Sequence, residues 1–174
     1  MIVANKNGFF RHIEYVPLDE PEAAVASSQQ SEPNAMKLWD APETLSKKEG
    51  VSWENNSVKL DNAMLVSPDP LFFNASLRAL VKMNPDSRAP GISLRGMRDA
   101  NGDLRYSLSL EPIRRVIQLQ VFSDTGRTVL REWPYPRDYG AEEWARLELR
   151  VVGDELTASI DGKALGTLHD SMLA

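Results

Sequence analysis

The chain of 174 residues contains no cysteine, which excludes a disulfide framework, a thiolate nucleophile and a thiolate metal ligand. It has only two histidines, far apart in the sequence, so a transition-metal site would need an unusual shell made almost entirely of oxygen ligands. No apolar run approaches the roughly 18 residues that a membrane-spanning helix needs. We therefore expect no metal, no other cofactor and no membrane span.

Positive charge is also scarce. The 20 lysines and arginines are outnumbered by 25 acidic residues, which leaves a formal net charge of −5. Such a chain has no general attraction to a phosphate backbone, so we expect no nucleic-acid partner, although a local basic patch stays open. The first residues lack the charged head and apolar core of a signal peptide. Localisation is left open, and would be extracellular or periplasmic if the chain were part of an exported protein.

The hydrophobic content of 42% is enough for a full core, and the length suits one domain with an additional segment. Residues 1–17 hold a short apolar and aromatic piece that includes Phe9, Phe10 and Ile13. Residues 17–33 are rich in Glu, Ala, Ser, Gln and Pro, which predicts a flexible linker. The predicted division is an N-terminal piece with linker over residues 1–35 and a β-sandwich domain over residues 36–174.

Period-two alternation dominates from there on. In residues 73–83 every second side chain is apolar, and the side chains between them are mostly polar. The same pattern recurs at residues 104–110, 117–121 and 147–151, and it predicts strands with one buried face. Only residues 141–144 hint at a helical turn.

The joints between these runs have the chemistry of tight turns. Asn101-Gly102, Thr125-Gly126, Gly153-Asp154 and Asp161-Gly162 supply residues that tolerate a positive φ. Short turns join antiparallel strands, so we expect at least half of residues 60–168 to lie in antiparallel strands. The predicted fold class is all-β, a two-sheet antiparallel sandwich.

Three segments carry a family resemblance. The first is residues 73–95, an alternating strand and a loop that lead to P-G-I-S-L-R at 90–95, and the second is residues 106–110 leading to 117–121. The third and most specific is the hairpin at residues 143–163, E-W-A-R-L-E-L-R-V-V-G-D-E-L-T-A-S-I-D-G-K. They resemble the jelly rolls of the concanavalin A-like lectin/glucanase superfamily, including laminin G-like domains, and are similar to the bacterial 3-keto-disaccharide hydrolase family. The resemblance covers about residues 50–174. Such domains continue with a further strand, so we expect either a sandwich lacking its final strand or an N-terminal piece that replaces it.

The function that the resemblance implies is a non-catalytic carbohydrate-binding or glycan-recognition module of a larger bacterial protein. Two alternatives stay open, a glycoside-acting hydrolase of the keto-disaccharide type and a laminin G-like module that binds another protein. The paired glutamates that flank an aspartate in the superfamily's glucanases are absent, so no catalytic residue is assigned. Asp99 to Asp103 has the oxygen spacing that opens a calcium loop, but it reads more simply as a hairpin turn.

The candidates for glycan contact are Arg95, Arg78, Gln118, Trp133 and Tyr135. Arg95 is the arginine of the P-G-I-S-L-R match, and Arg78 and Gln118 lie on the polar faces of predicted strands. Trp133 and Tyr135 lie in a proline-containing segment that predicts an irregular loop able to present a ring to solvent; the alternative is that they close one end of the core. We expect Arg95 and this loop to form one shallow glycan surface, and Trp144 to be a packing residue.

Overall fold

The computed structural model describes residues 2–4, 8–18, 36–37, 50–54, 57–61, 63–65, 74–83, 89–99, 102–140 and 143–172. Every regular element in these ranges is a β-strand, and they contain no helix that could cross a membrane. The strands are β1 (Ile2–Ala4), β2 (Gly8–Pro17), β3 (Met36–Lys37), β4 (Val51–Glu54), β5 (Ser57–Leu60), β6 (Ala63–Leu65), β7 (Ala75–Met83), β8 (Gly91–Asp99), β9 (Gly102–Glu111), β10 (Val116–Ser123), β11 (Gly126–Pro134), β12 (Glu143–Val152), β13 (Glu155–Ile160) and β14 (Lys163–His169).

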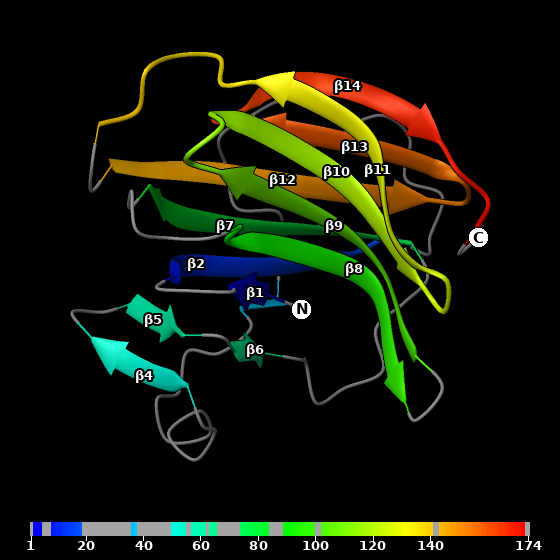
Figure 1. Ribbon diagram of the computed structural model, residues 1–174, viewed down its shortest axis with the longest axis horizontal. Helices are drawn as coiled ribbons and strands as arrows, with labels where there is room; N and C mark the ends of the chain where they lie inside the picture. Colours follow the sequence, from blue (N-terminus) through cyan, green and yellow to red (C-terminus); the bar gives the residue numbers. More distant parts are fainter. Residues whose placement is uncertain are drawn as a thin grey trace.

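The strands form two antiparallel sheets. The first sheet has the order β11-β10-β9-β8-β1-β6, and the second has the order β14-β13-β12-β7-β2-β5-β4, with β3 beside β2. In Figure 1 the strands β9 to β11 of the first sheet pass in front of β12 and β13 of the second. The all-β sandwich is thereby confirmed, and it is consistent with a jelly roll. More than half of residues 60–168 lie in strands, as expected.

The core lies between the two sheets and is formed by the apolar side chains at every second position of their strands. Leu108 on β9 and Ile117 on β10 project from the first sheet, and Leu147 and Leu149 on β12 project from the second; all four are fully buried. Burial of each such side chain contributes about 1.5–3 kcal/mol relative to an exposed one. The sequence-predicted inward rows of β9, β10 and β12 are therefore the core rows of the structure.

The N-terminal piece, which the predicted division at residue 35 separates from the sandwich domain, contributes strands to both sheets. The structure inserts β2 between β7 and β5 and places β1 between β8 and β6. Phe10 and Tyr15 of β2 are buried in the core. A bulge between Arg11 and Glu14, with His12 at φ 45°, interrupts the period-two pattern and hides the strand in the sequence. The linker predicted beyond it lies almost entirely outside the described residues.

The turn predictions hold where the structure describes them. Gly126, Gly153, Asp161 and Gly162 all have positive φ angles. Strand β11 was missed, because it is an edge strand with most of its residues exposed on both faces and so has no apolar alternation. Its last residues correct the predicted irregular loop, which begins only after Pro134. The hinted helical turn is not formed at residues 143 and 144, which open β12.

Candidate functional site

Arg95 lies where β8 is distorted. A bulge falls between Leu94 and Met97, and Arg95 itself has φ 51°, which turns its side chain out of the regular alternation. Its Nη2 donates to Asn74 Oδ1 at 3.4 Å, and the same oxygen accepts the backbone N–H of Gly153 at 2.8 Å. Arg95 thus ties the first sheet to the turn between β12 and β13. We call this part of the sandwich the Arg95 end.

The electrostatics of Arg95 agree with a role in packing. Burial lowers the pKa of its guanidinium, and the nearby Tyr106 and Asp154 oppose that change only in part. Close by, the Tyr106 hydroxyl donates to Asp170 Oδ1 at 2.6 Å, so a second polar link joins the sheets here. Arg95 is held inside a connected set of polar contacts rather than displayed on a surface.

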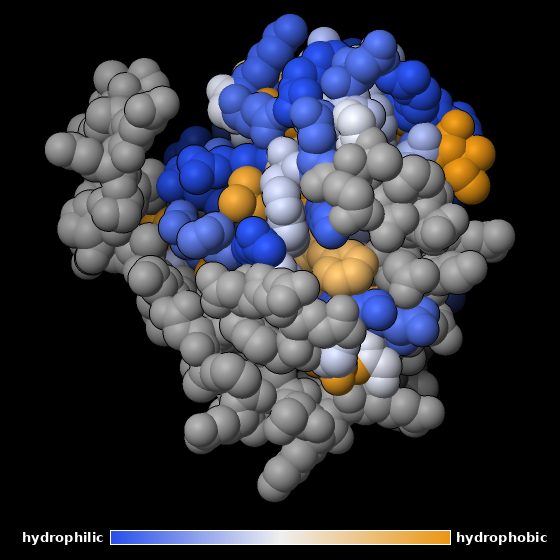
Figure 2. All heavy atoms as spheres, turned by 90° about the vertical axis from the view of Figure 1, so that its left-hand side faces the viewer, coloured by the Kyte–Doolittle hydropathy of each residue, from blue (hydrophilic) through white to orange (hydrophobic). Residues whose placement is uncertain are grey.

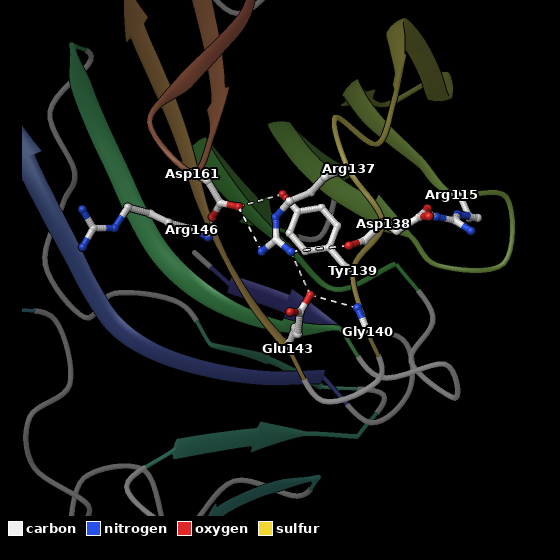
Figure 3. A network of polar contacts seen from close by, with 8 residues as sticks. All are labelled: Arg115, Arg137, Asp138, Tyr139, Gly140, Glu143, Arg146 and Asp161. Atoms are coloured by element: carbon white, nitrogen blue, oxygen red, sulfur yellow. Dashed lines mark hydrogen bonds and ion pairs between the residues drawn. The ribbon is translucent and has the colours of Figure 1, made fainter.

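At the other end of β12 a second arginine organises the loop that follows β11. The Arg137 guanidinium lies 4.0 Å above the Tyr139 ring. Its Nη1 lies 2.9 Å from Glu143 Oε2, and its Nη2 lies 3.7 Å from Asp161 Oδ2. Figure 3 shows the two carboxylates approaching the guanidinium from different elements. We call Tyr135, Arg137, Tyr139, Glu143 and Asp161 the Arg137 cluster.

Backbone N–H groups fix both carboxylates of this cluster. Gly140 N donates to Glu143 Oε2 at 2.8 Å, and Arg146 N donates to Asp161 Oδ1 at 2.8 Å. Arg137 and Glu143 nevertheless remain 49% and 44% exposed. Figure 2 looks at this side of the molecule and shows mainly hydrophilic residues on the described surface. The charged groups are therefore both ordered and accessible to solvent.

Two tyrosines form the inner part of the cluster. The rings of Tyr135 and Tyr139 meet edge to face, with 5.6 Å between centroids. The Tyr139 hydroxyl donates to Asp161 Oδ2 at 2.8 Å, while the buried Tyr135 hydroxyl has no hydrogen-bond partner among the described residues. Burial raises the pKa of both phenols, and the hydrogen bond to Asp161 raises that of Tyr139 further. Both hydroxyls are neutral near pH 7.

Trp133 closes the gap between the outer edges of the two sheets. It pairs with Ile117 across the first sheet and packs, partly buried, against the core. Its indole faces Gly166 on β14, where an added Cβ would meet the ring at 3.5 Å. Trp133 and Tyr135 thus both pack against the core, which is the alternative considered for them from the sequence.

The two remaining candidates lie on outer sheet faces. Arg78 Nε donates to Glu148 Oε1 at 2.9 Å on the outer face of the second sheet. Gln118 is 1% exposed on the outer face of the first sheet, where it donates to Glu132 and accepts from Gln120. The hydrogen bond from Gln118, followed by that from Arg114, lowers the pKa of Glu132.

The predicted single surface is not formed. Strand β12 begins with Glu143 in the Arg137 cluster and ends with Val152 at the Arg95 end. Ten residues at roughly 3.3 Å each separate the two ends by about 30 Å. The structure brings Trp133 and Tyr135 together and leaves Arg95, Arg78 and Gln118 apart from them.

Sequence reasoning missed Arg137 and Tyr139, and it placed Asp161 only in a turn, without a contact to Glu143. Strand alternation does not join these residues, because the contact is made by a loop and a turn that are distant in sequence. The available signal was local: Arg137 and Tyr139 follow Trp133 and Tyr135 at every second position. Three aromatic residues and one arginine at every second position, outside the predicted strands, could have identified the cluster.

Comparison with known protein families finds no family that matches, and comparison with curated proteins finds no similar chain. Among solved structures, the chain is similar to the carbohydrate-binding module CBM66 from Bacillus subtilis. The TM-score is 0.43 and the sequence identity 16%, over 56% of this chain and 67% of that chain. A likeness this distant carries no argument about the function of the present chain.

Proposed function

We propose that this chain is a non-catalytic carbohydrate-binding module, and that the Arg137 cluster is its glycan-binding site. The observation that carries the proposal is an exposed guanidinium that stacks on Tyr139 and is held between two carboxylates. Sugars offer hydroxyl groups that pair with planar donors and with carboxylate acceptors, and apolar C–H faces that pack on aromatic rings. All three kinds of partner are present here within one loop and one adjoining turn.

The order of the cluster supports weak but specific binding. Because backbone N–H groups already fix Glu143 and Asp161, little side-chain entropy remains to be lost when a ligand binds. Asp138 beside the cluster is 90% exposed and supplies a further acceptor, and it is paired with Arg115. The site is preorganised on the protein side.

The same contacts favour binding over cleavage. Retaining glycoside hydrolysis needs two carboxyl groups about 5 Å apart, one of them placed to give up and recover a proton. Here Asp161 accepts from Arg146 N and the Tyr139 hydroxyl and forms an ion pair with Arg137, and Glu143 accepts from Arg137 and Gly140 N. Both carboxylates are engaged as acceptors that position the loop.

Calorimetric titration with a panel of neutral oligosaccharides tests the proposal. We expect a dissociation constant on the order of 10 μM to 1 mM for the best ligand, equivalent to about −7 to −4 kcal/mol. Arg137→Ala should weaken this binding by about tenfold or more, the loss of one charged hydrogen-bonding group.

Arg127→Ala is the matched control, because Arg127 is an exposed arginine on β11 of the same sheet edge. It should leave the affinity unchanged, and the melting temperature of each variant is measured alongside. Wild-type affinity in the Arg137→Ala variant, or no binding to any member of the panel, would overturn the proposal. Capture of a protein ligand instead would favour the interaction-module alternative.

A further inference from the structure

The outer face of the second sheet carries an excess of positive charge. On β12, Ala145, Leu147 and Leu149 are fully buried, so Arg146 and Arg150 project to the outside and are exposed. Figure 3 shows the Arg146 side chain extending away from the Arg137 cluster. Strand β12 therefore presents the cluster at its start and a separate row of side chains along its outer face.

The pairing register places further charged side chains of the neighbouring strands on the same outer face as Arg146 and Arg150. The described outward-facing basic residues are Arg11, Lys59, Arg78, Lys82, Arg146 and Arg150, and the acidic ones are Glu14, Glu148 and Glu155. Among the described side chains of this face, six basic residues against three acidic ones give a formal charge of +3, in a chain whose net charge is −5. We call it the basic face.

Two aromatic rings are set among these cations. The Arg11 guanidinium lies 4.4 Å from the centroid of the Trp144 ring. Lys59 and Lys82 lie 5.5 and 5.1 Å from the centroid of Phe9. Trp144, expected from the sequence to be a packing residue, is thus part of a cation–π pair on the outside of the sheet.

The acid in the middle of the row is already neutralised. Glu148 lies between Arg146 and Arg150 on β12, and its Oε1 accepts from Arg78 and Ser76 at 2.9 Å each. Its Oε2 accepts from Ser159 at 3.3 Å. Within the described part of the chain, no side chain pairs with the guanidinium of Arg146 or Arg150. Two exposed arginines thus remain available to an external anion.

We propose that the basic face binds an acidic polysaccharide, with carboxylate or sulfate groups on Arg146 and Arg150 and a sugar ring against Trp144. The inference rests on the proposed carbohydrate-binding function and adds a ligand class at a second surface. The planar fork of arginine matches carboxylate and sulfate groups. Four residues at about 3.3 Å each separate the two arginines by about 13 Å along the strand, which suits charges repeated along an extended chain.

The neighbouring strand favours a glycan over a nucleic acid. Thr157 and Ser159 of β13 lie opposite Arg150 and Glu148, and they add hydroxyl groups beside the arginine row. Neutral hydroxyls complement sugar hydroxyls, whereas a phosphate backbone is bound mainly through many cations and is repelled by the acidic remainder of the molecule.

The test measures binding of the whole chain to polygalacturonate and heparin, which carry carboxylate and sulfate groups, with dextran as the uncharged polysaccharide. We expect binding to at least one acidic polymer, weakening several-fold when salt is raised from about 50 to 300 mM because ionic contacts are screened. The double variant Arg146→Gln/Arg150→Gln should lose about tenfold or more in affinity. Arg127→Gln/Arg131→Gln makes the same charge change on β11 of the other sheet and should lose less than about twofold.

Equal affinity in both double variants would overturn the inference, as would equal binding of dextran and the acidic polymers. Tighter binding of a single-stranded oligonucleotide through Arg146 and Arg150 would replace the glycan by a nucleic acid. The two proposals fail separately: loss of neutral oligosaccharide binding in Arg137→Ala tests only the cluster, and the Arg146→Gln/Arg150→Gln variant tests only the basic face.

Discussion

Arg95 and Arg137 are the same type of side chain at opposite ends of one sandwich, and their surroundings give them different roles. Desolvation lowers the pKa of Arg95, which ties a strand bulge to Asn74 and the neighbouring turn. Desolvation also acts on Arg137, but the hydrogen bond and charge of Glu143, with Tyr139 and Asp161, offset it and raise the pKa. The first arginine completes the fold, while the second keeps about half of its surface in solvent. Residue type alone does not distinguish a structural arginine from one that can meet a ligand.

The largest expected effect on stability concerns the buried side chains of β12, the strand that runs from the Arg137 cluster to the Arg95 end. Leu149→Ala should lower the free energy of unfolding by about 2–4 kcal/mol, because it removes fully buried methyl groups and leaves a cavity. The adjacent Arg150→Ala should be nearly silent, since that side chain is exposed. Urea denaturation of both variants measures the difference. The reverse order would mean that the faces of β12 are exchanged, and with them the assignment of the basic face.

A smaller effect on stability should distinguish Arg95 from Arg137. Arg95→Ala should lower the free energy of unfolding by about 1–2 kcal/mol, the usual range for loss of a partly buried hydrogen-bonded group. Arg137→Ala should leave stability unchanged within error, because its ion pairs lie in solvent. Parallel denaturant titrations provide the comparison. Equal destabilisation by the two substitutions would show that the Arg137 cluster is as structural as the Arg95 end.

The smallest effect concerns the tyrosines of the Arg137 cluster at alkaline pH. In the unfolded chain both phenols ionise near pH 10, whereas in the folded chain the pKa of Tyr135 and of Tyr139 is raised. Above about pH 10 the unfolded state therefore binds fewer protons than the folded state, and the free energy of unfolding falls as pH rises.

Ultraviolet titration of phenolate formation should show at least two of the four tyrosines ionising late. Tyr135→Phe should remove one late-titrating group and flatten the alkaline loss of stability. Four tyrosines ionising together near pH 10 would contradict the packing described for this cluster.

The strands with clean alternation could be predicted from the sequence. In β7, β9, β10, β12 and β13 one face meets the core and the other meets polar surroundings, so period two is visible. Strand β2 was not predicted as a regular strand because its bulge breaks the pattern, and edge strand β11 was missed because neither of its faces is consistently buried.

The candidate site was less predictable, for a physical reason. Trp133 and Tyr135 were chosen because their residue types suit sugar contacts, and of the two only Tyr135 belongs to the Arg137 cluster. Arg137 becomes a candidate only through its ion pairs with Glu143 and Asp161. A loop and a turn bring these residues together, and no periodicity in the sequence indicates that contact. Arg95 was chosen because it belongs to the P-G-I-S-L-R motif, and in the structure its side chain links β8 to Asn74.

The position of β2 has a consequence for how the chain folds. Phe10 pairs with Val81, and β2 is the only described strand that joins β7 to β5, so the second sheet is continuous only when the N-terminal strand has found partners made much later. Pairing β2 with β7 closes a long loop, and the chain loses entropy before the contacts between the strands can compensate for it. This slows folding. During synthesis, β7 and β5 expose unpaired backbone groups wherever β2 is not yet in place, and such edges are sites of association between chains. The early-made strand β2 can therefore join the two parts of the sheet that carries the basic face only after β5 and β7 have been made.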